Sequence, residues 1–464
     1  MSAFTRLRDR WPGPDAPLRI LGASGQLGLG IPEEAFRRGI AARPHVIAAD
    51  MGSVDPGPAY LGSGRMAAPK ALVRRDLELV LKAARDLDVP LLIGSAGTAG
   101  AAPHLEEVRA ILAEVAAAAG LSFRLGLIRS DVPGASVEAA LTDGRLRPIG
   151  DLPADHAAIR ALPHIVAQAG MAPFIKALEQ GADVVLAGRA CDTAPFAVIP
   201  VLLGYEVGPA MHMGKILECT SLCCEPGGRD AILGTLEGDS FTLESMSPER
   251  RATPRSVAAH ALYEQADPFE FREPAGAVRL DQARYEAAGD RRVRVSGARW
   301  EPAEKPTVKI EGARRIGARA VGIYAAADPE FIRQSDQILR DVQANVRQIV
   351  PGNWSLYVRR YGIDGVTPAP EGSAPHEIAL LIECVAPSAE RARTALAAMR
   401  QQLLHFGFPG RRATGGNLAI AFTPAELDAG EAWEFSLYHI MELQTEAALD
   451  ALFPVSVETI GGQP

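Results

Sequence analysis

The chain has 464 residues, of which 47% are hydrophobic and 22% charged, and its formal net charge is −8. These values are ordinary for a globular protein of two or three domains, and the acidic balance argues against a general binder of nucleic-acid backbones. We expect no membrane span, because no stretch approaches 18 uninterrupted apolar residues, and the five cysteines with no visible secretory signal predict reduced thiols and a cytoplasmic location.

The first half of the chain alternates strand-like and helix-like segments. Strands are expected at 18–21, 45–49, 90–94, 123–128 and 184–186, with helices at 32–39, 72–86, 105–119 and 172–180. Repeated strand–loop–helix units predict an α/β fold with a mostly parallel sheet flanked by helices.

Polar or glycine-rich loops follow these strands, so they should meet at one edge of the sheet, where ligands bind in open α/β folds. The central stretch is 183–196, in which a short buried strand breaks at Gly188. The candidate site residues in these loops are Ser24, Gly25, Asp50, Ser53, Ser95, Gly97, Arg129, Arg189, Cys191, Asp192 and Thr193.

From residue 233 the pattern changes to period-two alternation, which predicts antiparallel strands at 292–300, 307–310 and 318–325 together with a helix at 256–265. A helix at 329–349 follows, and Asn353 begins strand, strand, helix, strand, strand. The expected organisation is residues 1–232 carrying the site, a strand-rich part at 233–352, and an α+β domain at 353–464.

Arginine is suited to bidentate binding of a carboxylate or phosphate, so Arg189 with Asp192 is the leading candidate pair. The two side chains could equally form an internal ion pair that fixes the turn. Cys191 beside Arg189 is either an activated thiol or inert packing. Glu218 is a candidate general acid or base.

The sequence does not match the motifs of the common cofactor-binding or zinc-binding sites. In the stretch Gly22 to Gly28, Ser24 and Leu27 stand where the dinucleotide fingerprint needs glycine, so a nicotinamide-dependent oxidoreductase is a minor alternative. Cys219, Cys223 and Cys224 lack the paired spacing of a zinc site. The sequence therefore identifies no cofactor and no metal ligands. Whether the protein needs a divalent metal stays open.

Several longer motifs resemble the acyclic terpene utilisation (AtuA-like) family. They are the Gly-rich first loop and the stretches 50–57, 94–97, 187–192, 259–268, 292–297 and 308–312. The resemblance implies a role in catabolism of branched acyclic terpenoids or other carboxylic acids, and a C-terminal domain similar to the ferredoxin-like one of that family. The sequence departs from the family at Tyr324, where an arginine is expected.

The leading hypothesis is a lyase of the hydratase/dehydratase type that acts on a small or branched carboxylic acid or its CoA thioester. Arg189, with Arg129, would hold a carboxylate, Ser24 and Ser95 would stabilise an enolate-like anion, and Asp192, Asp50 or Glu218 would move the proton. A carbon–carbon lyase or other acyl-CoA enzyme, and a non-catalytic scaffold or binding subunit, are the alternatives. A homo-oligomer is expected in each case, with no nucleic-acid or membrane partner.

Overall fold

The protein is described by a computed structural model that covers residues 1–220, 222–263, 265–370, 372–373, 375–412 and 414–461. The chain forms two compact units, Met1–Ala313 with Phe435–Pro464, and Arg314–Glu434. The division therefore falls at 314 and 434 rather than at the expected 233 and 353. The physical reason is that β-strands of the strand-rich part extend the first sheet at one edge, and the end of the chain adds a strand at the other.

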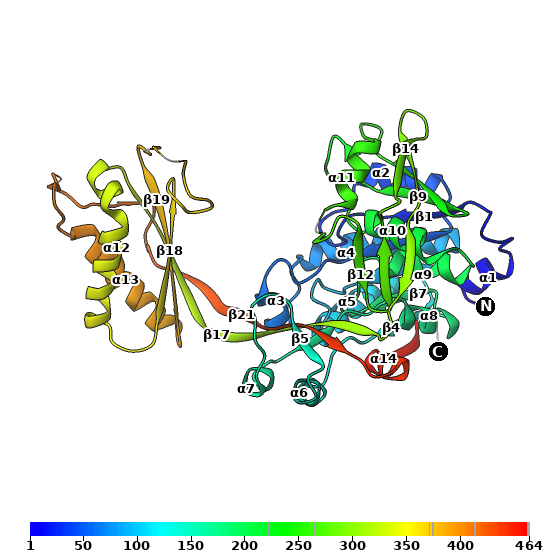
Figure 1. The fold of residues 1–464 in the computed structure, drawn as a ribbon, viewed down its shortest axis with the longest axis horizontal. Helices are drawn as coiled ribbons and strands as arrows, with labels where there is room; N and C mark the ends of the chain where they lie inside the picture. Colours follow the sequence, from blue (N-terminus) through cyan, green and yellow to red (C-terminus); the bar gives the residue numbers. More distant parts are fainter. Residues whose placement is uncertain (221, 264, 371, 374, 413, 462–464) are drawn as a thin grey trace. The chain divides into compact units, whose positions relative to one another are not determined.

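The first unit is built on a large mixed sheet (Figure 1). In spatial order its strands are β14 (Arg284–Ala287), β15 (Arg292–Ser296), β10 (Ser240–Ser245), β9 (Ile232–Glu237), β1 (Leu18–Gly22), β2 (Val46–Asp50), β3 (Leu91–Gly94), β7 (Val184–Ala187), β4 (Phe123–Ile128) and β22 (Val455–Ile460). In the described part of this sheet, the parallel pairings join β1, β2, β3, β7 and β4. The other pairings are antiparallel, so the expected mostly parallel sheet is observed for these central strands alone.

Helices cover both faces of the parallel strands. Successive residues of β2 alternate between two hydrophobic clusters, Val46 and Ala48 in one, Ile47 and Ala49 in the other, which is the strand period of two. The Val46 cluster includes apolar residues of α8 (Met171–Glu179), α9 (Ala194–Leu202) and α10 (Val207–Leu217), and the Ile47 cluster those of α2 (Glu33–Ala41), α4 (Lys70–Leu87) and α5 (Ala102–Ala119). Burial on both faces explains why these strands are almost wholly apolar.

A second, three-stranded sheet of the first unit matters for the site. It has the order β12 (Glu270–Glu273), β13 (Gly276–Arg279) and β16 (Arg299–Pro302), all antiparallel. The remaining elements of this unit are α1 (Ala3–Asp9), α3 (Pro58–Ser63), α6 (Gly134–Thr142), β5 (Leu146–Pro148), α7 (His156–Arg160), β6 (Ile165–Ala167), β8 (Cys224–Glu225), β11 (Arg251–Ala252), α11 (Pro254–Ala261) and α14 (Glu446–Leu452).

The second unit follows the order strand, helix, strand, strand, helix, strand. Its elements are the later part of β17 (Thr307–Ala326), α12 (Pro329–Ile349), β18 (Ser355–Tyr361), β19 (Ile378–Ala386), α13 (Ala389–His405), β20 (Ala419–Ile420) and the earlier part of β21 (Leu427–Glu442). The neighbours in its sheet are β18–β19–β17–β21. Phe331 of α12 and Leu396 of α13 pack with Leu380 and Ile382 of β19 in a core of its own.

Three sequence expectations differ from the structure. The strands expected at 307–310 and 318–325 form one strand, β17, because its middle, including Gly312 and Gly317, stays extended. The strand expected at 292–300 is broken at Gly297, whose φ of +86° turns the chain into β16. The helix expected at 256–265 is α11, which ends at Ala261, and one residue of that stretch, 264, lies outside the described residues. Among the described helices, none has the length and apolarity to cross a membrane.

Candidate functional site

The loops after the central strands meet at one edge of the sheet, as the parallel arrangement requires. Leu27 N–H donates to the Asp50 carbonyl at 2.8 Å, Met51 N–H to that of Gly94 at 3.1 Å, and Ala96 N–H to that of Ala187 at 2.9 Å. These bonds link the ends of β1, β2, β3 and β7. Residues as far apart in the chain as Leu27 and Ala187 therefore lie in one polar region.

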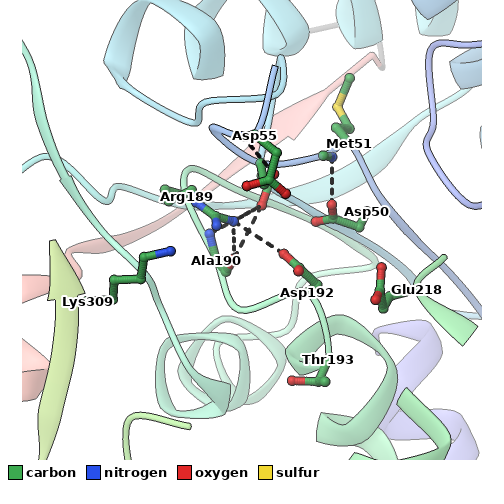
Figure 2. Close-up of polar contacts among 12 residues, drawn as sticks. Asp50, Met51, Asp55, Arg189, Ala190, Asp192, Thr193, Glu218 and Lys309 are labelled. Carbon is green, nitrogen blue, oxygen red and sulfur yellow. Dashed lines mark hydrogen bonds and ion pairs between the residues drawn. The ribbon is translucent and has the colours of Figure 1, made fainter. Parts of the chain in front are cut away.

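Arg189 lies at the centre of this region and is 2% exposed (Figure 2). Its Nη1 donates to Ser95 Oγ at 3.0 Å and to the Ala190 carbonyl at 2.7 Å, and lies 3.3 Å from Asp192 Oδ1. Its Nε lies 3.0 Å from Glu311 Oε2. Burial alone would lower the pKa of Arg189, but Glu311 and the aspartates raise it. The guanidinium is thus a permanent cation largely committed to protein partners.

Two glycines allow this placement. A Cβ on Gly100, whose φ is +67°, would lie 2.0 Å from Arg189 N, and a Cβ on Gly188 would lie 2.6 Å from the Gly100 carbonyl oxygen. Arg189 N–H donates to that carbonyl at 3.0 Å. The close approach of two backbones fixes where the Arg189 side chain begins.

Glu311 of β17 is fully buried and is bonded by two cations. Lys309 Nζ lies 3.0 Å from its Oε1, and the same ammonium stands 4.2 Å from the centre of the Tyr438 ring. Burial would raise the pKa of Glu311, yet Arg189 and Lys309 together hold it below its usual value. Lys309 is partly exposed and can face a ligand, which Arg189 cannot.

Asp50 is a buried carboxyl group at the end of β2. Its Oδ2 accepts from Gly52 N–H at 2.6 Å, whereas its Oδ1 has no hydrogen-bond partner among the described residues. Burial, reinforced by the nearby Asp192 carboxylate, raises the pKa of Asp50 well above its ordinary value, although Arg189 opposes the shift. The surroundings of Asp50 therefore favour its neutral form over its charged form.

A cavity of about 480 Å³ opens beside this network, and Cys191, Gln168, Glu273 and Lys309 line it. Thr193 Oγ1 donates to Glu273 Oε1 at 2.5 Å, and the Cys191 thiol lies beside the same carboxyl group and partly stabilises its charged form. Burial raises the pKa of Glu273 to about 7. Glu273 can therefore both accept and release a proton near neutral pH.

Cys191 has the opposite character to an activated thiol. It is buried, and burial followed by the neighbouring Glu273 carboxyl raises its pKa well above the ordinary value. The thiol is thus neutral at physiological pH, which favours packing over activation among the two interpretations of Cys191.

Four candidates mainly shape the surrounding turns. Ser24 Oγ bonds the backbone of Gln26 two residues on, and Ser53 Oγ accepts from Asp55 N–H at 3.1 Å. Gly25 lies in the same turn as Ser24. Gly97 has a φ of +59°, and a Cβ there would lie 2.9 Å from side-chain carbons of His104 and Met66. These residues fix the loops, and Gln26 Nε2 ties two of them by donating to the Met51 carbonyl at 3.0 Å.

Two expected site residues form ion pairs away from the Arg189 network. Arg129 is 45% exposed and pairs with Glu106 at 3.0 Å, so it does not join Arg189. The reason is that its side chain turns outward toward α5. Glu218 is buried and pairs with Lys215 at 2.7 Å, and its charge still reaches Asp50. In Figure 2 it lies to one side of the Arg189 network.

Sequence reasoning missed Glu273, Lys309 and Glu311, which lie in the strand-rich part rather than in the strand-end loops. One signal was present, because Glu311 interrupts an alternating strand at a position that burial would otherwise give to an apolar residue. Among the described residues, no group of three or more His, Cys, Asp or Glu side chains is placed to hold a metal ion.

The fold and the site define a mixed α/β protein with an acid-containing cavity beside the ends of its parallel strands. A family model described as acyclic terpene utilisation family protein AtuA matches residues 60–230 and 237–429, which is most of the chain. The chain belongs to this family, and membership implies a role in acyclic terpene utilisation. The match begins at residue 60, so the Gly-rich first loop and the stretch 50–57 lie outside it. No curated protein and no solved structure matches the chain.

Proposed function

We propose that the protein is a lyase of the hydratase/dehydratase type acting on a small or branched carboxylic acid, or its thioester, and that Glu273 carries the proton. The observation that supports this most directly is a buried carboxyl group with a pKa of about 7 at a cavity, with one oxygen held by Thr193 and the Cys191 thiol beside the carboxyl group. General acid–base catalysis is most efficient when the pKa of the group lies near the working pH.

In the dehydration direction, the Glu273 carboxylate takes the proton from the carbon next to the substrate carbonyl. The electron pair left behind moves toward the carbonyl oxygen, and the ammonium of Lys309 stabilises the negative charge that develops there. The protonated Glu273 then gives its proton to the hydroxyl group on the next carbon, which leaves as water while the double bond forms. Addition of water follows the same steps in reverse.

This assignment changes the roles proposed from the sequence. The substrate carboxylate or carbonyl is placed at Lys309, because Arg189 is buried and committed to Ser95, Asp192 and Glu311. Arg189 becomes a positioning residue that fixes Glu311, which in turn fixes Lys309. Asp50, whose pKa is raised by burial, is 2% exposed and does not line the cavity, so it is not assigned a contact with the substrate.

The second unit supports a further part of the proposal. Its order of strand, helix, strand, strand, helix, strand, with neighbours β18–β19–β17–β21, is the order of a ferredoxin-like domain. We assign it that fold and a role in association of the protein with itself, which sedimentation of the purified chain tests.

The test is turnover of a panel of branched hydroxy acids and their thioesters by wild type, Glu273→Gln and the exposed control Glu179→Gln. Glu273→Gln should lower kcat by about 10²–10⁴-fold, the usual contribution of a general base, whereas Glu179→Gln should leave it unchanged. Product analysis separates loss of water from cleavage of a carbon–carbon bond. Full activity of Glu273→Gln would refute the assignment.

A further inference from the structure

The cavity beside Glu273 is bordered by basic side chains that the proton transfer does not use. Arg147, Arg272, Arg279 and Lys305 form what we call the cationic rim. With Lys309, five basic side chains line the cavity against three acidic ones, and one of those three is Glu273. The whole chain carries a net charge of −8, so the positive lining is a local inversion of charge. A cleft lined with one sign of charge concentrates ligands of the other sign.

The alternation of the small sheet builds part of this rim. Glu270 and Arg272 are two residues apart in β12 and share one face, and Arg279 of β13 pairs directly across from Glu270. The intervening Phe271 and Val278 are buried on the other face. Burial of the apolar face fixes the pairing of the two strands. The side chains of Glu270, Arg272 and Arg279 on the polar face line the cavity.

The rim cations are less committed than Arg189. Arg272 and Arg279 share the carboxylate of Glu270, and Arg279 Nε also lies 4.0 Å from Glu301 Oε2. The Arg272 side chain is 80% exposed. Lys305 pairs with Glu442 at 2.8 Å. Arg147 is exposed and has no carboxylate within 4 Å among the residues that the structure describes. A guanidinium group with free N–H donors can form two parallel hydrogen bonds to the oxygens of one phosphate. Several such groups at one cavity favour a phosphate-bearing ligand over a single carboxylate.

The chemistry of the neighbouring acid points the same way. A proton next to a free carboxylate is very weakly acidic, because its removal would place a second negative charge beside the first. A thioester carbonyl carries no charge and spreads the electron pair over its oxygen. A weak base such as Glu273 therefore needs a substrate activated in this way.

We propose that the cationic rim binds the phosphate groups of a carrier to which the substrate acid is joined as a thioester. The proposal rests on the proposed function and names its substrate class. The acyl part lies in the 480 Å³ cavity toward Glu273 and Lys309, and the phosphate groups of the carrier lie against Arg147, Arg272, Arg279 and Lys305 of the same lining.

The experiment is calorimetric titration of the full chain with coenzyme A, adenosine 3′,5′-bisphosphate and inorganic phosphate. The proteins are wild type, Arg147→Ala, Arg272→Ala and the control Arg37→Ala, whose arginine is exposed on α2 and lies outside the cavity lining. We expect coenzyme A to bind wild type, with Kd raised about tenfold or more by either rim substitution, since one charge-assisted bond contributes that much. Arg37→Ala should bind as wild type does, and Tm should be the same in all four.

Equal binding by Arg147→Ala, Arg272→Ala and Arg37→Ala would overturn the proposal, as would a failure of coenzyme A to bind. Inorganic phosphate that binds as tightly as coenzyme A would also overturn it, because the rim would then be a free-phosphate site. Glu273→Gln separates the two proposals, since it should keep coenzyme A binding while losing turnover. If coenzyme A does not bind but the protein still turns over free acids in a Glu273-dependent way, the carrier proposal is refuted and the proposed function is not.

Discussion

Arg189 and Glu311 stand 122 residues apart in the chain, and their side chains form a buried ion pair with 3.0 Å between Nε and Oε2. The exposed fractions of the two side chains are 2% and 0%. The pair joins the loop after β7 to strand β17, and so links the strand-end region to the strand that carries Lys309.

Removal of one member of this pair should destabilise the protein strongly. Arg189→Met leaves Glu311 buried with only Lys309 as a cationic partner, and breaking a buried pair costs about 3–5 kcal/mol. Arg129→Met breaks an exposed pair with Glu106 and should cost at most ~1 kcal/mol. Urea unfolding at pH 7 measures both. Equal losses would contradict the structural role of Arg189.

Glu273 should give the activity an inflection near pH 7. If the carboxylate removes the substrate proton, kcat rises with pH through the pKa of about 7, and Glu273→Gln abolishes this inflection together with most of the rate. A pH–rate profile that keeps its shape in the residual activity of Glu273→Gln would assign the inflection to another group.

The same pKa shift predicts how stability depends on pH. The folded pKa of Glu273 lies above its unfolded value of about 4.3, so the folded state binds more protons between that pH and about 7. Stability from this group is fully present below the unfolded pKa and is lost as pH rises through the folded pKa. As pH rises through this window, the free energy of unfolding should decrease less for Glu273→Gln than for wild type. Urea titration at several pH values measures the difference.

Asp50→Asn should become more stable relative to wild type as pH rises. The pKa of Asp50 is raised by burial and by Asp192, so ionisation of the carboxyl opposes folding at high pH, while an amide has no such cost. The amide oxygen can still accept from Gly52 N–H. Comparison of Tm at pH 5 and pH 9 tests this, and a constant difference would show that Asp50 is ionised in the folded protein.

Gly100 and Gly120 form a matched pair for the backbone contact at Arg189. Their φ angles are +67° and +64°, but an added Cβ meets Arg189 N at 2.0 Å only at Gly100, and at Gly120 it meets nothing within 4 Å. Gly120→Ala should cost about 1–2 kcal/mol from left-handed strain alone. The loss of stability for Gly100→Ala should be several times larger, or the variant should not fold. Thermal unfolding and the yield of soluble protein measure this.

Cys191 should react slowly with iodoacetamide at pH 7, because its thiol is buried and its pKa is raised. Mass spectrometry of the modified peptide measures the rate, with Cys219, which is partly exposed, as the comparison within the same chain. Cys191→Ala should keep turnover. Rapid modification of Cys191 together with loss of turnover would indicate that Cys191 is a nucleophile after all.

Hydrophobic periodicity is a local property, so the sequence was enough to predict the strand–helix units of the first half, the helix at 329–349 and the strand that follows Asn353. It also placed Asp50, Ser95, Arg189 and Asp192 in one region, since parallel strands end at a common edge. Only the tertiary structure decided which of them face a cavity. Arg189 is enclosed by partners from β17, Arg129 turns outward to Glu106, and Glu273 reaches the cavity from β12. Burial and the pKa shifts that follow depend on such long-range contacts, which no local pattern encodes.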